Sequence, residues 1–198
     1  QMCIRDRFGI EQYVEMALQY QRLDSETTDF VFEETDLDEI IRTSVRKYAR
    51  QFIAKKISMS YEPVETTVIT DKKWLSFVIE QVISNAVKYT KTGGIKIYLE
   101  DGDGTMSVPV QKASHRKEDD GENSGMKSVR LVIEDTGIGI RAEDLPRICE
   151  MGYTGCNGHE GQHSSGIGLY LCSRILKKLG HTFSITSKEG VGTVVKIG

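Results

Sequence analysis

Residues 71–90 read DKKWLSFVIEQVISNAVKYT, and this segment carries the clearest helical pattern of the chain. Its apolar residues recur at helical spacing, which predicts a helix with one broad buried face. Asp71 is the expected N-cap, and the helix is expected to end before Gly93 and Gly94, which suit a C-terminal stop. We expect the buried face to comprise Trp74, Leu75, Val78, Ile79, Val82, Ile83 and Ala86.

A polar stripe runs along the same helix. Gln81, Asn85 and Lys88 follow at spacings of four and three residues, so they share one side of the helix. The amide oxygen of Asn85 is a hard ligand suited to Mg²⁺, which takes few protein ligands beside phosphate oxygens and water. Lys88 is placed to meet a phosphate group. For this helix alone, a solvated polar face is an equally good interpretation.

A carboxylate followed by two glycines forms a second motif. The sequence EDTGIG at 134–139 places Asp135 at the end of an expected strand, with Gly137 and Gly139 after it. Glycines let the backbone approach a flat ligand, and the carboxylate accepts a hydrogen bond from an exocyclic amine such as that of adenine. A simple turn at the end of a strand explains the motif almost as well.

A glycine-rich helix entry forms a third motif. The sequence SSGIGL at 164–169 places Gly166 and Gly168 at the start of an expected helix. Free backbone N–H groups at a helix N-terminus bind phosphate, and the helix dipole adds to this effect. Ser164 and Ser165 can cap or donate, so an ordinary N-cap is the alternative interpretation.

The rest of the chain predicts an α/β sandwich. A polar stretch at 101–128 contains few aliphatic residues and is interpreted as a mobile loop between two strands. Because several strands are joined as hairpins, we expect a mixed, mostly antiparallel sheet with helices packed on one face. Strands are expected near 30–33, 57–61, 66–69, 95–100, 129–135, 181–187 and 191–197. Further helices are expected at 8–23 (apolar side Phe8, Tyr13, Val14, Ala17, Leu18, Leu23), after the cap Asp36, and after Gly166 (core side Leu169, Cys172, Ile175, Leu176, Leu179, ending at Gly180).

Composition excludes several classes of protein. A formal net charge of -3 gives no basic field for nucleic acid. No apolar run approaches the ~20 residues of a membrane span, and the start lacks the apolar region of a signal peptide. Cys149, Cys156, His159 and His163 are zinc-ligand types close in sequence, but the cysteine spacing is too long for a common zinc knuckle. Reduced cytosolic thiols are the favoured interpretation.

Together and in this order, the three motifs resemble those of the GHKL superfamily of ATP-binding domains, specifically histidine kinases. EQVISNAVKYT at 80–90 resembles the N box, EDTGIGI at 134–140 the G1 box, and SSGIGLYL at 164–171 the G2 box. GVGTVVKI at 190–197 resembles the closing strand. The stretches MGYTGCNG and GIGLYLCSRILKKLG resemble the intramembrane-sensing group that works beside peptide-antibiotic transporters.

The resemblance implies the GHKL, or Bergerat-type, fold and a site for ATP and Mg²⁺. Asn85 would coordinate Mg²⁺ on the nucleotide phosphates. Lys88 and Tyr89 would line the phosphate and nucleoside side of the site. Asp135 would hold the adenine amino group.

The glycines of the two later motifs would complete this site. Gly137 and Gly139 would shape the adenine wall. Gly166, Gly168 and Leu169 would meet the phosphates.

The resemblance also implies a domain division. Residues 1–29 would be an N-terminal remnant and the end of a dimerisation helix, and 30–198 the ATP-binding catalytic domain. This domain would include the loop at 101–128 and an ATP lid at 147–165. The phosphoacceptor histidine would lie upstream, so we expect this chain to bind ATP without phosphorylating itself. The parent would be a homodimer anchored in the cell membrane, with this domain in the cytoplasm, and would relay phosphate to a response regulator; a monomeric fragment is compatible with this.

One departure from the pattern concerns the lid. Many histidine kinases carry an arginine there, whereas this chain has Tyr153 and Thr154. Lys88, His159 and His163 are the candidates to neutralise the transferring phosphoryl group.

Two other functions are compatible with such an ATP-binding domain. ATPases of the gyrase or mismatch-repair kind use a glutamate four residues before the metal-binding asparagine, where this chain has Gln81. An amide cannot act as a base, and Glu80 is rotated by about 100° around the helix. The second alternative is a non-catalytic nucleotide-binding module, which retention of all the motif residues disfavours.

Overall fold

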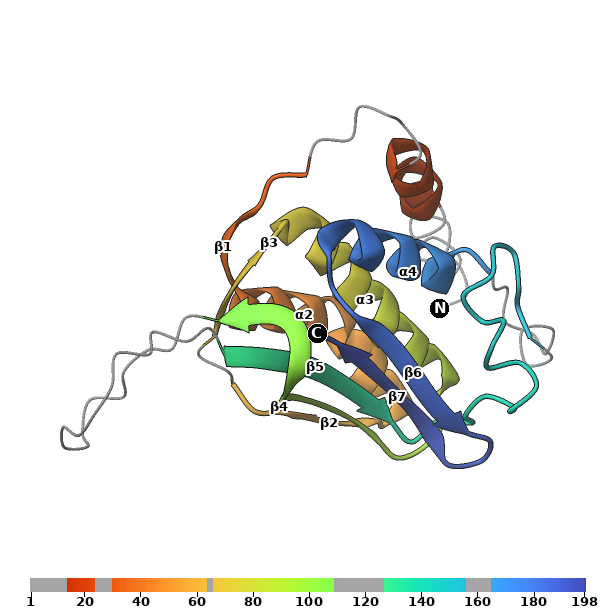
Figure 1. Cartoon of the computed structure of the whole chain (residues 1–198). Coiled ribbons are helices and arrows are strands. Elements are labelled where there is room, and N and C mark those ends of the chain that lie inside the picture. The colour runs from red at the N-terminus through yellow and green to blue at the C-terminus, as the bar shows by residue number, and fades with distance from the viewer. Residues whose placement is uncertain (1–13, 24–29, 64–65, 109–126, 156–164) are drawn as a thin grey trace.

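The strands of the computed structural model form two sheets, as Figure 1 shows. The structure describes residues 14–23, 30–63, 66–108, 127–155 and 165–198. In the larger sheet the β2–β4 pair is parallel and the other three pairs are antiparallel, which confirms the predicted mixed sheet. Its order is β2 (Ser58–Tyr61), β4 (Gly94–Val108), β5 (Lys127–Asp135), β7 (Gly192–Ile197) and β6 (Phe183–Lys188). The smaller sheet pairs β1 (Glu33–Asp36) antiparallel with β3 (Thr67–Thr70).

Three helices cover one side of the larger sheet (Figure 1). They are α2 (Leu37–Lys55), α3 (Lys72–Tyr89) and α4 (Gly168–Leu179), and α3 contacts both of the others. A further helix at 14–23 lies near α4 (Figure 1). Within the described ranges, no helix combines the length and the hydropathy that a membrane span requires.

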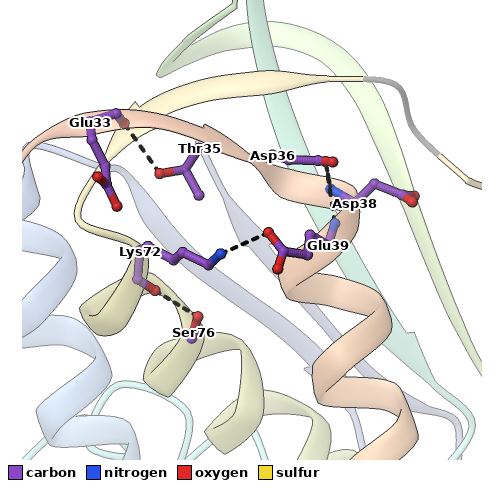
Figure 2. Close-up of polar contacts among 7 residues, drawn as sticks. All are labelled: Glu33, Thr35, Asp36, Asp38, Glu39, Lys72 and Ser76. Carbon is purple, nitrogen blue, oxygen red and sulfur yellow. Dashed lines mark hydrogen bonds and ion pairs between the residues drawn. The ribbon is translucent and has the colours of Figure 1, made fainter.

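The N-terminal ends of α2 and α3 are joined by polar contacts (Figure 2). Asp36 Oδ1 accepts hydrogen bonds from the amides of Asp38 (2.9 Å) and Glu39 (3.2 Å), which confirms Asp36 as an N-cap. Lys72 Nζ lies 2.7 Å from Glu39 Oε2 and so links the first turns of the two helices. Contacts further along pair later residues of α2 with later residues of α3, so the two helices run in the same direction.

Helix α3 is the centre of the core. Asp71 caps it through a 3.1 Å bond from the amide of Trp74, as predicted. All seven residues of the predicted apolar face are buried, and Phe77 and Val87 are buried with them. Burying a large apolar side chain contributes about 1.5–3 kcal/mol, so this face holds the helix in one rotation about its axis. The polar stripe on the other side is thereby fixed in direction.

Several predicted boundaries were wrong. The first strand begins at Glu33 rather than near Phe30, because its partners are the residues of β3. The loop expected at 101–128 is shorter, since β4 continues to Val108 and β5 begins at Lys127, across a register shift after Asp101. Residues 109–126 of that loop lie outside the described residues.

The predicted core side of α4 was also wrong at one residue. Leu169 is partly exposed, and Leu171 is buried together with the other predicted core residues. Gly180 adopts the left-handed conformation with φ 77° and ends the helix, as expected.

Helix 14–23 packs through a face that shares only Leu23 with the predicted apolar side. Val14 and Leu18 are about half exposed, at 51% and 49%. The docked face consists of residues spaced three and four apart: Met16, Gln19, Tyr20 and Leu23. Lys178 on α4 donates to the carbonyl of Leu23 at 2.7 Å, and the Tyr20 ring lies 6.4 Å from the Tyr170 ring at a tilt of 43°. The surface of α4 that contacts this helix offers an aromatic ring and an ammonium, and both contact the face that carries polar as well as apolar residues.

Candidate functional site

Helix α3 presents the predicted polar residues on its C-terminal half. Asn85, Lys88 and Tyr89 are half-buried, and Gln81 is buried. The Lys88 ammonium lies 5.2 Å from the centre of the Tyr89 ring. Because Gln81 is buried, the interpretation of the stripe as a fully solvated polar face is wrong for this residue. A buried amide needs polar partners in place of water.

Asp135 is the last residue of β5, and its carboxylate is held by the turn that follows. Its Oδ1 accepts a 2.8 Å hydrogen bond from the amide of Gly137. Burial raises the pKa of this carboxyl above its ordinary value, while hydrogen bonds from the backbone of Gly137 and Thr193 oppose the rise. A half-buried carboxylate with a fixed direction is suited to accept a hydrogen bond from a neutral donor.

We expect the Asp135 carboxyl to titrate above about 3.9, the ordinary pKa of aspartate. The physical reason is that burial disfavours the charged form more than the two backbone bonds favour it. The measurement is the carboxyl-carbon chemical shift of Asp135 followed by NMR from pH 3 to pH 7. A midpoint at or below the ordinary value would contradict the burial that the structure shows.

The glycines after Asp135 allow two close backbone contacts. A Cβ on Gly137 would lie 2.8 Å from the carbonyl oxygen of Tyr89, so only glycine lets this turn rest on the end of α3. The amide of Ile138 donates to the same Tyr89 oxygen at 3.2 Å. Gly139 has φ 69°, and a Cβ there would lie 2.1 Å from the carbonyl oxygen of Lys188. The turn is therefore wedged between α3 and the connection between β6 and β7.

The glycine-rich entry to α4 is equally constrained. Gly166 has φ 67°, and its carbonyl accepts a 3.0 Å bond from the amide of Gly152. Ser165 Oγ accepts a hydrogen bond from the amide of Ile167 at 3.3 Å, but Ile167 is itself the N-cap of α4 and no side chain caps the helix, so the predicted N-cap by Ser165 was wrong. Gly168 is the first residue of α4, and a Cβ there would lie 3.0 Å from Gln81 Oε1.

The two glycine motifs meet α3 on either side of Asn85. The turn after Asp135 contacts Tyr89, four residues after Asn85. The entry to α4 contacts Gln81, four residues before it. With a rise of about 1.5 Å per residue, each contact is about 6 Å along the helix from Asn85. The structure thus brings together the three motifs that are far apart in sequence.

The expected lid is described at 147–155 and at Ser165. Tyr153, in the place where an arginine was expected from the resemblance, donates from its hydroxyl to the carboxylate of Asp144. The guanidinium of Arg147 lies 4.3 Å from the centre of the Tyr153 ring and its Nε lies 3.0 Å from Glu150 Oε2. The Tyr153 side chain therefore bonds to Asp144 and contacts Arg147 within the same segment.

The predicted zinc alternative falls mostly outside the described residues. Cys156, His159 and His163 belong to the part that the structure does not describe, and so do two of the candidates to neutralise the phosphoryl group. Among the described residues, no group of three His, Cys, Asp or Glu could hold a metal ion. Cys149 and Cys172 are free thiols, and burial raises the pKa of both.

Glu80 is directed away from a catalytic role. Its carboxylate pairs with the ammonium of Lys47 on α2. A base that activates water must reach a proton of the attacking water molecule, whereas this carboxylate is held by Lys47 at the α2–α3 contact. The structure therefore adds to the sequence argument against a water-activating glutamate.

The sequence analysis did not identify the residues whose side chains bond to the backbone near Asp135 and its glycines. Ser187 Oγ accepts from the amide of Ile140 at 2.9 Å and donates to the carbonyl of Gly192 at 2.7 Å. Thr136 Oγ1 accepts from the amide of Gly94 at 2.9 Å. The contacts of Ser187 with Ile140 and of Thr136 with Gly94 join residues more than 40 positions apart. The contact of Ser187 with Gly192 closes the β6–β7 connection. No local sequence pattern indicates any of them.

Comparison with known proteins gives a consistent result. The family model described as "Histidine kinase-, DNA gyrase B-, and HSP90-like ATPase" matches residues 70–198. The sensor histidine kinase YxdK of Bacillus subtilis is 34% identical over 94% of this chain and 51% of its own length. The sensor protein kinase GraS of Staphylococcus aureus is 30% identical over 95% of this chain and 48% of its own length. The chain spans about half the length of these curated relatives.

A solved structure shows the same fold. The crystal structure of full-length ShkA in complex with AMPPNP has a TM-score of 0.71, and the match covers 99% of this chain and 37% of that one. Sequence identity is 19%, so this similarity concerns the fold alone.

Proposed function

Because the chain belongs to the family of histidine kinase-, DNA gyrase B- and HSP90-like ATPases, we propose that it is the ATP-binding catalytic domain of a sensor histidine kinase. The observation that carries this proposal is the meeting of both glycine motifs with α3 on either side of Asn85. The domain binds ATP and presents its γ-phosphoryl group to a histidine in an upstream segment. A response regulator then receives the phosphate. The names of the aligned relatives, which are sensor histidine kinases, support the kinase over the ATPase alternative.

Each site residue has a proposed role. Asp135 accepts a hydrogen bond from the exocyclic amine of adenine, and Gly137 and Gly139 keep the backbone flat beside the ring. Lys88 balances phosphate charge, and the Tyr89 side chain borders the nucleoside.

The entry to α4 has a proposed role toward the phosphates. Gly166, Gly168 and Leu169 lie at or next to the helix N-terminus, where free N–H groups favour an anion. Phosphoryl transfer depends mainly on positioning and on balancing charge, so the upstream acceptor segment matters as much as the nucleotide site.

Mg²⁺ fits this arrangement through Asn85. Its amide is half-buried on the polar side of α3, between the two contacts described above. An amide oxygen suits a hard cation that keeps most of its ligands as water and phosphate. When bound, Mg²⁺ would neutralise charge on the phosphates.

Other proposed features concern the whole protein. Residues 1–29 are the N-terminal remnant and the end of a dimerisation helix, 30–198 the catalytic domain, and 147–165 the lid. The parent protein is proposed to be a membrane-anchored homodimer with this domain in the cytoplasm. We further propose that it belongs to the intramembrane-sensing, peptide-antibiotic-transporter-associated group, which the resemblance to YxdK and GraS supports.

The Mg²⁺ role predicts a selective effect of Asn85→Ala. Calorimetric titration with ATP should show that wild type binds more tightly when Mg²⁺ is present, and that Asn85→Ala loses this increment while keeping the Mg²⁺-independent binding. Ser76→Ala is the matched control, because Ser76 lies in the first turns of the same helix and donates to Lys72. Loss of the Mg²⁺-independent binding in Asn85→Ala would instead assign the residue a direct role toward the nucleotide. Failure of wild type to bind ATP at all would favour a non-catalytic scaffold.

A further inference from the structure

The C-terminal end of α3 has an unusual donor. An α-helix leaves its last four carbonyl groups without partners inside the helix. At the end of α3, these carbonyls receive a donor from α2. The ammonium of Lys55 donates to the carbonyl oxygens of Lys88 (3.0 Å) and Thr90 (3.4 Å), and also to that of Val87. The carbonyl of Tyr89, between them, accepts from the amide of Ile138.

Lys55 therefore shares the end of α3 with the turn that holds Asp135. Three of the terminal carbonyls bond to one side chain of α2, and the fourth bonds to the backbone of that turn. Lys88 and Tyr89, both proposed to line the nucleotide site, belong to this same stretch of backbone. The Lys55 ammonium thus bonds to the backbone directly before and after the Tyr89 carbonyl.

The end of α2 places Lys55 at this point. Lys55 is the last residue of α2, and Lys56 stops the helix in the left-handed conformation with φ 57°. The next residue, Ile57, is buried and its amide returns to the carbonyl of Phe52. Because α2 and α3 run in the same direction, their C-terminal ends lie together, and a cation there meets the negative ends of both helix dipoles.

We propose that Lys55 is a positioning residue for the nucleotide site, acting through the carbonyl groups at the end of α3. The inference rests on the proposed ATP-binding function. Without the ammonium, the three carbonyls lose this donor and the last turn of α3 loosens. The Tyr89 carbonyl then no longer supports Ile138, and the turn beside the Asp135 carboxylate shifts.

The test compares Lys55→Met with Lys47→Met. Both variants remove one positive charge and a lysine side chain that links α2 to α3. Lys47, however, pairs with Glu80 and touches no terminal carbonyl of α3 among its described contacts. Hydrogen exchange of the Ile138 amide, measured by NMR in the nucleotide-free chain, should accelerate about tenfold in Lys55→Met and change little in Lys47→Met. ATP affinity, measured by calorimetry, should fall about tenfold in Lys55→Met alone. Lys55→Arg, which keeps the charge and the donors, should restore both properties in large part.

The outcomes separate this inference from the proposed function. Wild-type exchange of Ile138 in Lys55→Met would overturn the positioning role. If Lys55→Met does not fold, Lys55→Gln, which keeps a shorter neutral donor, serves the same comparison and should give an intermediate exchange rate. If exchange depends on Lys55 but the wild-type chain binds no ATP, the positioning role is supported and the proposed function is refuted.

Discussion

Asp135→Asn is expected to weaken ATP binding about 100-fold while the chain stays folded. A hydrogen bond to a charged acceptor contributes about 1.5–3 kcal/mol, which corresponds to a factor of about 10 to 150. The asparagine amide also turns a donor toward the adenine amine, so one donor is left without an acceptor. The carboxylate direction matters because Oδ1 is already engaged by the amide of Gly137.

The folded state should tolerate this substitution. Burial raises the pKa of Asp135 in the folded chain above its unfolded value, so the ionised carboxylate costs stability. That cost appears as pH rises through the window between the two pKa values and is complete above the folded one. Asparagine carries no charge, so at neutral pH the midpoint of thermal unfolding should be unchanged or higher.

The measurement is a calorimetric titration of wild type and variant with ATP. Glu134→Gln is the control, because successive strand residues point to opposite faces and Glu134 directly precedes Asp135 on β5. Equal affinity in wild type and Asp135→Asn would refute the proposed adenine contact. A large loss in Glu134→Gln as well would indicate a general effect of charge near the end of β5.

Gly139→Ala should reduce the free energy of unfolding by about 3–5 kcal/mol and abolish ATP binding. The new Cβ would lie 2.1 Å from the carbonyl oxygen of Lys188 and 3.0 Å from the Cα of Glu189, which are backbone atoms with little freedom to move. The residue also has φ 69°, where an L side chain adds a cost of about 1–2 kcal/mol. To remove the clash the turn must leave its place between α3 and the β6–β7 connection.

Gly180→Ala isolates the conformational part of this effect. Gly180 has φ 77°, and a Cβ there meets nothing within 4 Å. Urea unfolding should therefore show a loss of about 1 kcal/mol for Gly180→Ala. If the two variants lose equal stability, the close approach of Gly139 to Lys188 does not contribute.

Much of the fold could be predicted because it depends on neighbouring residues. The caps Asp36 and Asp71 bond to amides two or three residues away, and the apolar face of α3 follows from helical spacing. Asp135 and its glycines were predicted as a site for the same reason, since the motif is continuous along the chain. The family follows from these motifs and from their order.

The mistakes arose where a choice depended on distant partners. Periodicity could not show that helix 14–23 docks through Met16 and Tyr20 and leaves Leu18 half exposed, because both faces carry apolar residues. The start of β1 was misplaced for a similar reason, since its register is decided by β3 across the small sheet. Extended pairing also lengthened β4 beyond the point where its composition became polar.

By itself, the sequence determined the N-caps Asp36 and Asp71, the apolar face of α3 and the three motifs, since each rests on residues close together in the chain. Tertiary structure alone decided that Gly168 meets Gln81 and that Lys55 bonds to the end of α3. The physical reason is that these contacts join residues tens of positions apart. Their geometry is set only when whole helices and strands pack, and no short pattern of residues encodes the distance between them.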